Sequence, residues 1–247
     1  MALIEAEGVH VRFGDRVVLE QIDLAVEEGE LHGIMGPNGA GKTTFFNVLT
    51  GRVKPSRGRI RLAGEDLAGL SPHAIANKGV ARSFQTMTLF DEFTARENVM
   101  IALPAFRARG FDVRRAVAGD TGFALEADAV LASVGLAGRS AVIARQLPYG
   151  ERRALEIAVA LAQRPRVLCL DEPTSGLGID GTQRLVELIG RIRANLTIVV
   201  IEHEMDFLFS LADRISVIHW GQVLARGTPR ELQANEWVRR SNLGRFA

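Results

Sequence analysis

The chain has 247 residues, of which 47% are hydrophobic; this composition argues against disorder and allows one large domain or two small ones. Thirty Lys and Arg residues against 29 Asp and Glu leave a net charge of +1, so we expect no nucleic-acid partner. The single cysteine, Cys169, excludes an internal disulfide framework and a cysteine-based zinc site. Its apolar surroundings predict a small core residue.

The apolar runs of the chain are short. Residues 167–170 and 197–201 are the most apolar, and both are far shorter than the roughly 20 residues that a spanning helix needs. Residues 1–10 lack the basic-then-apolar pattern of a signal peptide. If the protein acts at a membrane, we therefore expect it to dock onto the helices of another protein.

The first hundred residues predict short strands, one glycine-rich loop and short helices. Ser71 followed by Pro72 is a favourable helix start. Thr94 and Glu97 match a capping box, which predicts a helix toward residue 103. The expected strands are 16–24, 29–35, 57–62 and 80–84, and a helix is expected at 42–49.

The character of the chain changes after Pro104. Residues 104–147 are rich in Ala, Arg and Gly and poor in strand formers, so we expect helices and loops that form a smaller domain. Residues 150–163 have a strongly helical pattern. Strands and helices then alternate, which predicts a largely parallel sheet covered on both faces. The expected strands are 167–170, 196–201, 215–219 and 223–225, with a helix at 182–193.

Residues 36–43 fit the pattern G-x-x-x-x-G-K-[ST], after an apolar strand and before a helix. Glycines let the backbone curl so that several N–H groups point at one phosphate, and the helix N-terminus adds partial positive charge. In this pattern Lys42 reaches the β- and γ-phosphates, and the Thr43 hydroxyl ligates Mg²⁺. The alternative is a glycine-rich turn that happens to precede a helix. The expected phosphate-binding residues are Gly36, Pro37, Asn38, Gly39, Ala40, Gly41, Lys42, Thr43 and Thr44.

An apolar strand ends in two adjacent carboxylates, Asp171 and Glu172. An aspartate at this place in P-loop enzymes holds Mg²⁺, and a carboxylate one residue later can polarise the attacking water. A solvated strand end is the alternative. His203 follows another apolar strand and could donate a hydrogen bond to the γ-phosphate, although such a histidine is more often structural. The structural interpretation is kept for His10, His32, His73 and His219.

The run LPYGERR, at residues 147–153, narrows the choice among NTPases with these motifs. It resembles the signature motif of ABC ATPases, and it precedes the strand with the two carboxylates, as that family requires. The resemblance covers the whole chain: Gln85 resembles the Q-loop glutamine, residues 171–174 the Walker B end, and His203 the switch histidine. Phe13 lies where an aromatic residue usually stacks on adenine.

This resemblance implies an α/β P-loop NTPase fold, with a RecA-like core that has a mixed sheet, plus an inserted helical subdomain. Residues 1–85 and 161–247 would form the nucleotide-binding core with a C-terminal extension, and residues 86–160 the helical subdomain. Two copies would pair head to tail. ATP would lie between residues 36–44 of one copy and the helix start at Gly150 of the other.

The same resemblance implies roles for single residues in the hydrolysis of ATP with Mg²⁺. The implied catalytic residues are Glu172 as general base, His203, Lys42 and Gln85. The implied neighbours of Mg²⁺ are Thr43, Gln85 and Asp171. Outside the glycine-rich loop, the implied nucleotide contacts are Phe13, Gln85, Tyr149, Gly150 and Glu151.

A finer resemblance is to the ATPase subunits of branched-chain amino-acid importers. It rests on residues 72–76, 79–85, 93–99 and 201–205, and on the close of the chain from Gly227. It implies a peripheral subunit on the cytoplasmic face of the bacterial inner membrane. The implied partners are a second ATPase subunit, identical or paralogous, two integral-membrane permease subunits and, indirectly, a periplasmic or surface solute-binding protein, with no nucleic acid.

Two positions depart from the family pattern. Pro148 stands where the signature usually has Ser, so a hydroxyl that contacts the γ-phosphate across the dimer is missing. We expect a weakened rather than abolished ATP sandwich. Gly178 replaces the usual D-loop aspartate, which weakly supports pairing with a non-identical ATPase. The groove beside residues 85–93 is expected to receive a coupling helix of the permease.

Several rival functions remain open. The ATPase of a urea or amide importer, or of a lipid or lipopolysaccharide exporter, belongs to the same class. A soluble ABC protein acting on ribosomes or DNA usually carries two ATPase units or a coiled-coil insertion, for which this chain has no room. A P-loop kinase does not account for the LPYGERR run.

Overall fold

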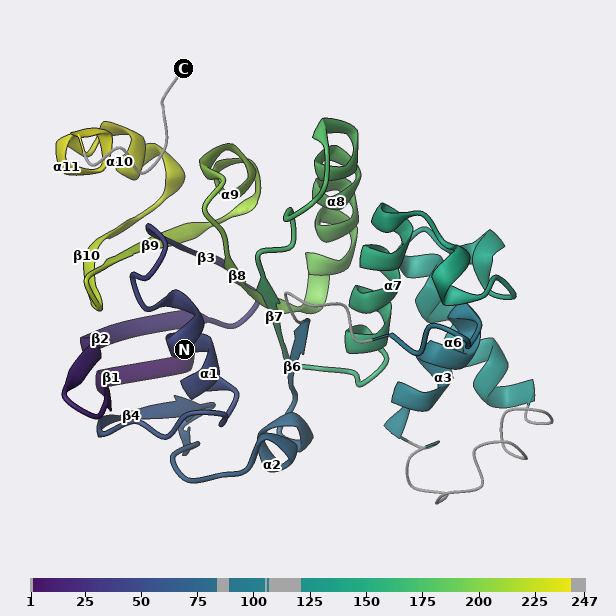
Figure 1. The fold of residues 1–247 in the computed structure, drawn as a ribbon, viewed down its shortest axis with the longest axis horizontal. Helices are drawn as coiled ribbons and strands as arrows, with labels where there is room; N and C mark the ends of the chain where they lie inside the picture. Colours follow the sequence, from purple (N-terminus) through teal and green to yellow (C-terminus); the bar gives the residue numbers. More distant parts are fainter. Residues whose placement is uncertain (1, 84–88, 105, 107–120, 241–247) are drawn as a thin grey trace.

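The computed structural model describes residues 2–83, 89–104, 106 and 121–240, which form two β-sheets and a group of helices at one end (Figure 1). Gln85 and the predicted boundary after it lie outside the described residues. The division of the chain into a core and a subdomain at 86–160 therefore stays a prediction.

The larger sheet has six strands in the order β10-β9-β3-β8-β7-β6, and all neighbours are parallel except β9 and β10. The strands β3, β7 and β8 are buried along their whole length, because each is an apolar run with helices or strands on both faces. The predicted, largely parallel sheet is thus present. Its strands are β3 (Leu31–Met35), β6 (Val80–Ser83), β7 (Val167–Asp171), β8 (Thr197–Ile201), β9 (Arg214–His219) and β10 (Gln222–Gly227).

The smaller sheet is antiparallel and has the order β2-β1-β4-β5. The strand expected at 16–24 is longer, and it pairs with a strand that precedes it. Partly alternating burial along both strands is what a sheet with one buried face requires. The strands are β1 (Ala2–Phe13), β2 (Arg16–Glu27), β4 (Arg57–Leu62) and β5 (Glu65–Asp66).

Two hydrophobic cores lie on opposite faces of the six-stranded sheet. In β7, Leu168 and Leu170 belong to the core that contains residues of the long helices, whereas Val167 and Cys169 belong to the core beneath the antiparallel sheet. This alternation follows from the period of two along a strand. Cys169 is fully buried, as predicted, and burial raises the pKa of its thiol to about 12.

Three helices, α3 (Ala95–Ala102), α6 (Thr121–Ser133) and α7 (Tyr149–Leu161), form what we call the helical group, at the opposite end of the long axis from β1 and β2 (Figure 1). The predicted capping box is confirmed, since Thr94 caps α3 and Glu97 bonds back to it. Arg96 joins α3 to Asp128 of α6 at 2.8 Å.

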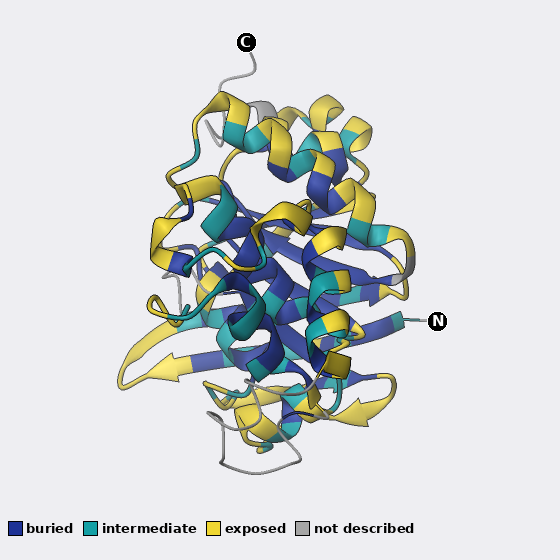
Figure 2. Cartoon of the chain, turned by 90° about the vertical axis from the view of Figure 1, so that its right-hand side faces the viewer, coloured by how far each residue is buried: buried dark blue, intermediate teal, exposed yellow. Residues whose placement is uncertain are grey.

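The remaining helices lie beside the sheets or, in the case of α10 and α11, near the C-terminus (Figure 1). Ser71 caps α2, as expected from the sequence. Figure 2 shows the buried strands behind helices whose outer faces are exposed. Among the described residues, no helix combines the length and apolarity needed to cross a membrane. These helices are α1 (Lys42–Leu49), α2 (Pro72–Asn77), α8 (Ile179–Ile192), α9 (Met205–Leu211), α10 (Pro229–Ala234) and α11 (Glu236–Arg240).

Candidate functional site

Glycines shape the loop between β3 and α1. Gly36 has a φ of 154°, and a Cβ atom there would lie 2.0 Å from the carbonyl oxygen of Ile218. Gly41 has a φ of 105°, and its Cβ would lie 2.6 Å from Cδ2 of Leu19. Both positions combine a left-handed backbone with a close approach that excludes any side chain. The loop can therefore wrap a ligand with its backbone alone.

The N-terminus of α1 is capped by no side chain. Gly41 is its N-cap residue and provides no side-chain acceptor. The first N–H groups of a helix lack intrahelical partners, and the helix dipole adds partial positive charge there. Asn38, Gly39 and Thr43 are exposed beside this end. The arrangement suits an anion such as phosphate.

Lys42 is buried at the start of α1 and is turned toward its own loop. Its Nζ donates to the carbonyl oxygens of Gly36 at 2.6 Å and Pro37 at 3.0 Å. Burial lowers the pKa of Lys42, while Glu172, Asp171 and Glu202 oppose that shift by their charge. The structure thus brings the predicted phosphate-binding lysine within electrostatic reach of both carboxylates at the end of β7.

Asp171 ends β7 and is buried against an arginine that the sequence analysis did not single out. Arg82, on the neighbouring strand β6, donates from Nη2 to Oδ2 of Asp171 at 2.5 Å. The same guanidinium donates to Asn47 at 2.7 Å and lies over the ring of Phe46. The ion pair orients the carboxylate at the sheet edge. A charged residue within the apolar strand 80–84 was the available signal for it.

Glu172 begins the sharp turn that follows β7. Its φ of 46° is in the left-handed region, and its N–H donates to the carbonyl oxygen of Ile201 at 2.9 Å. A non-glycine residue in this region costs about 1–3 kcal/mol and persists where surrounding contacts impose it, often at active sites. The side chain is half-buried.

His203 follows β8, and its ring is 53% exposed. The residue before it, Glu202, is fully buried and accepts hydrogen bonds from the N–H and hydroxyl of Thr174, at 2.8 and 2.6 Å. Its second oxygen accepts from the His203 N–H at 3.1 Å. Burial raises the pKa of Glu202 although these hydrogen bonds oppose the shift. Glu202 was not predicted as a site residue, although a carboxylate directly after an apolar strand was the available signal.

The run 147–153 forms the start of α7. Pro148 is the N-cap residue and provides no side-chain hydrogen bond, and the hydroxyl of Tyr149 donates to the Ser175 carbonyl oxygen at 2.9 Å. Gly150 is exposed, and Glu151 pairs with Arg139 at 2.9 Å. These residues belong to the helical group, away from β1 and β2 along the long axis (Figure 1).

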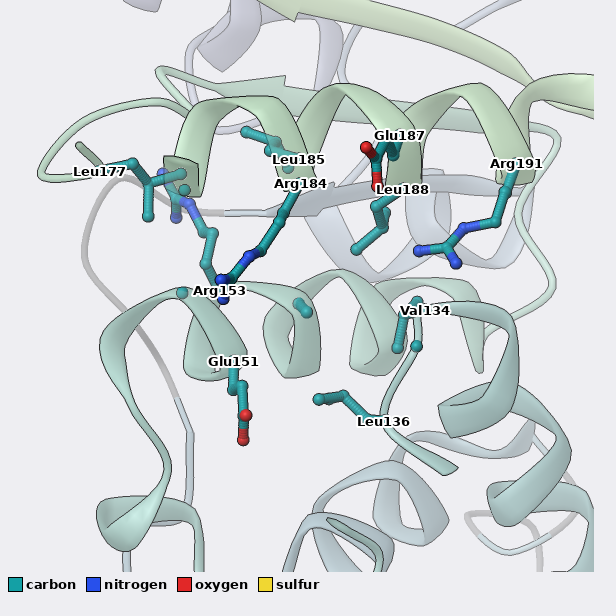
Figure 3. Close-up of a pocket in the computed structure, with 14 residues that line it drawn as sticks. Val134, Leu136, Glu151, Arg153, Leu177, Arg184, Leu185, Glu187, Leu188 and Arg191 are labelled. Atoms are coloured by element: carbon teal, nitrogen blue, oxygen red, sulfur yellow. The ribbon is translucent and has the colours of Figure 1, made fainter. Parts of the chain in front are cut away.

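A pocket of about 280 Å³ opens beside this helix start, between α7 and α8 (Figure 3). Glu151 and Arg153 line it from α7, and Arg184 and Arg191 extend toward α7 from α8. Arg153 is 2% exposed and was not identified from the sequence. Its guanidinium bonds the turn after β7.

Phe13, predicted to contact a base, lies at the end of β1 and is 53% exposed. Gln85, the predicted Mg²⁺ and coupling residue, lies outside the described residues. The structure therefore gathers Lys42, Asp171 and Glu172 around one site. Of the predicted signature contacts, Tyr149 bonds Ser175, three residues after Glu172, and Glu151 pairs with Arg139.

Comparison with known proteins gives a consistent result. A profile of the ABC transporter family matches residues 19–175. The chain belongs to the ABC transporter family. It is 41% identical to the high-affinity branched-chain amino acid transport ATP-binding protein BraF of Pseudomonas aeruginosa, and 39% identical to LivG of Escherichia coli strain K12. Each alignment covers 98% of this chain and 98% of the relative.

Solved structures agree with that assignment. The ADP conformation of MJ1267, an ATP-binding cassette of an ABC transporter, matches with a TM-score of 0.87 and 25% identity over 99% of each chain. CbiO1 from Clostridium perfringens, part of the cbiONQ transporter complex, matches with a TM-score of 0.81 over 97% of this chain and 94% of that one. The predicted P-loop fold and ABC ATPase activity are thus confirmed.

The residues of this ABC ATPase fit a bound Mg²⁺. The Thr43 hydroxyl is exposed at the start of α1, and the Asp171 carboxylate ends β7; both are hard oxygen ligands of the type that Mg²⁺ prefers. No cluster of three or more His, Cys, Asp or Glu side chains in the described part of the chain could hold a metal. Mg²⁺ is usually bound through one or two protein carboxylates, with waters and substrate phosphates completing its shell.

Proposed function

We propose that this chain is the ATP-hydrolysing subunit of a membrane importer for branched-chain or related amino acids. The observation that carries the proposal is the 39–41% identity to BraF and LivG along 98% of both chains. A match of this extent includes the helical group as well as the phosphate loop and the carboxylates of β7. The loop between β3 and α1 and the carboxylates of β7 supply the hydrolytic machinery.

Phosphate binding falls to the loop 36–44 in this proposal. Its backbone N–H groups and the start of α1 hold the β- and γ-phosphates. Lys42 exchanges its bonds to the Gly36 and Pro37 carbonyls for phosphate oxygens, so the loop shields the cation until ATP arrives. Mg²⁺, held by Thr43, Asp171 and Gln85, would screen the phosphate charge. The ring of Phe13, exposed at the end of β1, stacks on the adenine.

Hydrolysis depends on the residues that follow β7 and β8. Glu172 accepts a proton from the attacking water, and His203 donates a hydrogen bond to a γ-phosphate oxygen. The ion pair with Arg82 holds the Asp171 carboxylate in place at the end of β7. The exposed ring of His203 can reach a ligand without moving β8.

The second half of the ATP site comes from another ATPase subunit. Gly150 and the first N–H groups of α7 are exposed, and no side chain caps them. They therefore offer an anion site to the γ-phosphate bound by a facing copy. Pro148 contributes neither a hydroxyl nor an N–H to that half-site. Gly178, at the N-cap of α8, lacks the usual carboxylate and leaves a paralogous partner as the proposed alternative to a homodimer.

The remaining partners are two permease subunits and, through them, a solute-binding protein. In this proposal the ATPase lies on the cytoplasmic face of the inner membrane and takes a coupling helix near residues 85–93. A urea or amide importer is the nearest rival, and the names of the aligned relatives favour amino acids.

The complex purified from native membranes tests the proposal. The permease and binding protein are identified by mass spectrometry, and the complex is reconstituted in proteoliposomes. We expect leucine, isoleucine or valine, with the binding protein, to stimulate ATP hydrolysis, and Glu172→Gln to abolish the stimulation. Stimulation by urea or short amides alone, or a permease that extracts lipid, would contradict the amino-acid assignment. Co-purification of one ATPase species would argue against a paralogous partner.

A further inference from the structure

The turn at residues 172–175, which carries the proposed base Glu172, is held near its start by a buried arginine of the helical group, in addition to the Tyr149 hydroxyl that bonds Ser175 at its end. Arg153 of α7 donates from Nη2 to the carbonyl oxygen of Glu172 at 2.8 Å and from Nε to that of Pro173 at 3.1 Å. Nη1 pairs with Glu156, one turn along α7, at 2.6 Å. Three separate nitrogens of one guanidinium reach the two carbonyls and Glu156, a fixed fork that the single, compact ammonium of a lysine cannot reproduce.

The same turn is held from the other side by a buried carboxylate. Glu202 accepts both donors of Thr174, and its other oxygen accepts the N–H of His203. Glu202 and Thr174 are 0% and 1% exposed. One side chain therefore bonds the turn after β7 to the residue that carries the proposed switch ring.

These bonds form a continuous path from α7 to His203. Arg153 contacts the Glu172 and Pro173 carbonyls, Thr174 follows directly, and Glu202 joins Thr174 to His203. Burying charged groups costs several kcal/mol unless their hydrogen-bonding capacity is used. Arg153 and Glu202 use much of that capacity on the backbone of this turn. They also account for the left-handed conformation of Glu172, which its neighbours must impose.

We propose that Arg153 and Glu202 are positioning residues that jointly set the Glu172 carboxylate relative to the His203 ring. Neither touches the nucleotide: Arg153 acts through the Glu172 backbone, and Glu202 acts through Thr174 and His203. The inference rests on the proposed roles of Glu172 and His203 in hydrolysis. It adds that the placement of both groups depends on a buried link to the helix that starts at the signature run.

The test uses substitutions that keep charge or shape. Arg153→Lys retains a cation beside Glu156 but loses the three separate nitrogens that reach Glu156 and the two carbonyls. Glu202→Gln keeps an acceptor for Thr174 and places an NH₂ group against the His203 N–H, so it breaks one half of the link. Thr174→Val removes the hydroxyl bond to Glu202 and keeps the backbone N–H. Thermal unfolding of each full-length variant identifies any that does not fold. In that case the double substitution of Arg153 and Glu156 to Gln, which removes both charges of that pair, replaces Arg153→Lys.

We measure kcat and KM for ATP by phosphate release, and the dissociation constant of ATP by calorimetry, at several chain concentrations. Each substitution should lower kcat by about 10- to 100-fold, since small displacements of reacting groups have effects of this size. KM and the ATP dissociation constant should change less than about threefold, because the loop 36–44 is untouched. The Arg153→Lys, Glu202→Gln double variant should lose less than the product of the single losses, as expected of residues that act on one turn.

The exposed ion pair of Arg164 and Glu126, with 2.6 Å between Nη2 and Oε1, provides the matched control. Arg164→Lys and Glu126→Gln should leave kcat unchanged, singly and together. Wild-type kcat in Arg153→Lys and Glu202→Gln, or losses that multiply independently in the double variant, would overturn the inference. A parallel loss of ATP binding would also overturn it. If Glu172→Gln still hydrolyses ATP, the proposed base is wrong. That result is distinct from one in which the Arg153 and Glu202 variants keep wild-type kcat, which rejects only their positioning role.

Discussion

The guanidinium of Arg82 lies 2.5 Å from a carboxylate oxygen of Asp171, and the two side chains are only 7% and 4% exposed. The pair joins β6 to the end of β7, at the place where the proposed Mg²⁺ site begins. Arg82 also bonds Asn47 of α1, so one side chain ties both strands to the helix that follows the phosphate loop. The position of the Asp171 carboxylate therefore depends on three elements, β6, β7 and α1.

Arg82→Met should destabilise the protein by about 3–5 kcal/mol, because it leaves the Asp171 carboxylate buried without its cation. The free energy of unfolding in urea measures this loss. The Mg²⁺ concentration that half-saturates ATP hydrolysis should rise as well. Arg145→Met is the control: its pair with Glu92 has 3.4 Å between the charged atoms and both side chains exposed, so a change below about 0.5 kcal/mol is expected. Equal losses in the two variants would contradict the structural role of Arg82.

Lys42→Ala should weaken ATP binding by about 10- to 150-fold, which corresponds to the 1.5–3 kcal/mol of a hydrogen bond to a charged group. Calorimetric titration with ATP and Mg²⁺ measures the dissociation constant. Lys54→Ala is the control. It removes an exposed lysine near Lys42 in the sequence and should leave the dissociation constant of ATP unchanged. A normal ATP affinity in Lys42→Ala would show that the lysine serves only its own loop carbonyls.

Glu172→Gln should stop hydrolysis and accumulate an ATP-bound dimer, because the amide cannot accept the proton of the attacking water. Size-exclusion chromatography with light scattering, with and without ATP, measures the dimer, and phosphate release measures turnover. Glu187→Gln, an exposed position on α8, is the control and should remain monomeric and active under the same conditions. Brisk hydrolysis by Glu172→Gln would refute the base assignment.

Local motifs could be predicted because their physical cause lies within a few residues. Thr94 and Glu97 satisfy each other across one helical turn, and Gly36 and Gly41 allow a backbone that other residues cannot adopt. The apolar run before Asp171 likewise indicates a strand buried on both faces. The phosphate loop and the two carboxylates were therefore apparent from spacing alone.

Contacts between distant residues could not be predicted in the same way. Arg82 and Asp171 are 89 residues apart, and Thr174 and Glu202 are 28 residues apart. They meet because β6, β7 and β8 are neighbours in the sheet. The residue pattern within each strand does not determine that strand order. The sequence motifs thus identify groups proposed to touch ATP, whereas the residues that orient those groups emerge from the tertiary structure.

Acidification should destabilise the protein through His32. The ring is fully buried, with Nδ1 2.7 Å from Glu30 and Nε2 2.9 Å from Ser216, and burial lowers its pKa below 6.5. Between the folded pKa and 6.5 the unfolded chain binds more protons, so unfolding becomes easier as the pH falls through that window. The slope from one such group is at most about 1.4 kcal/mol per pH unit. His32→Gln should flatten this part of the profile, measured by urea unfolding between pH 5 and pH 7, relative to His73→Gln on the surface.

Pro148→Ser should tighten ATP-driven dimerisation, because it adds a hydroxyl and an N–H at the proposed second half of the ATP site. Serine at the N-cap of α7 also stabilises the helix by about 1 kcal/mol, so two effects must be separated. Pro148→Asp caps the helix equally well and places a negative charge against the γ-phosphate. In the Glu172→Gln background, the dimer dissociation constant at saturating ATP should fall for Ser and rise for Asp, with Pro148→Ala, which adds only the N–H, between the parent and Ser. Tightening by Ser and Asp alike would assign the effect to the helix and exclude the phosphate contact.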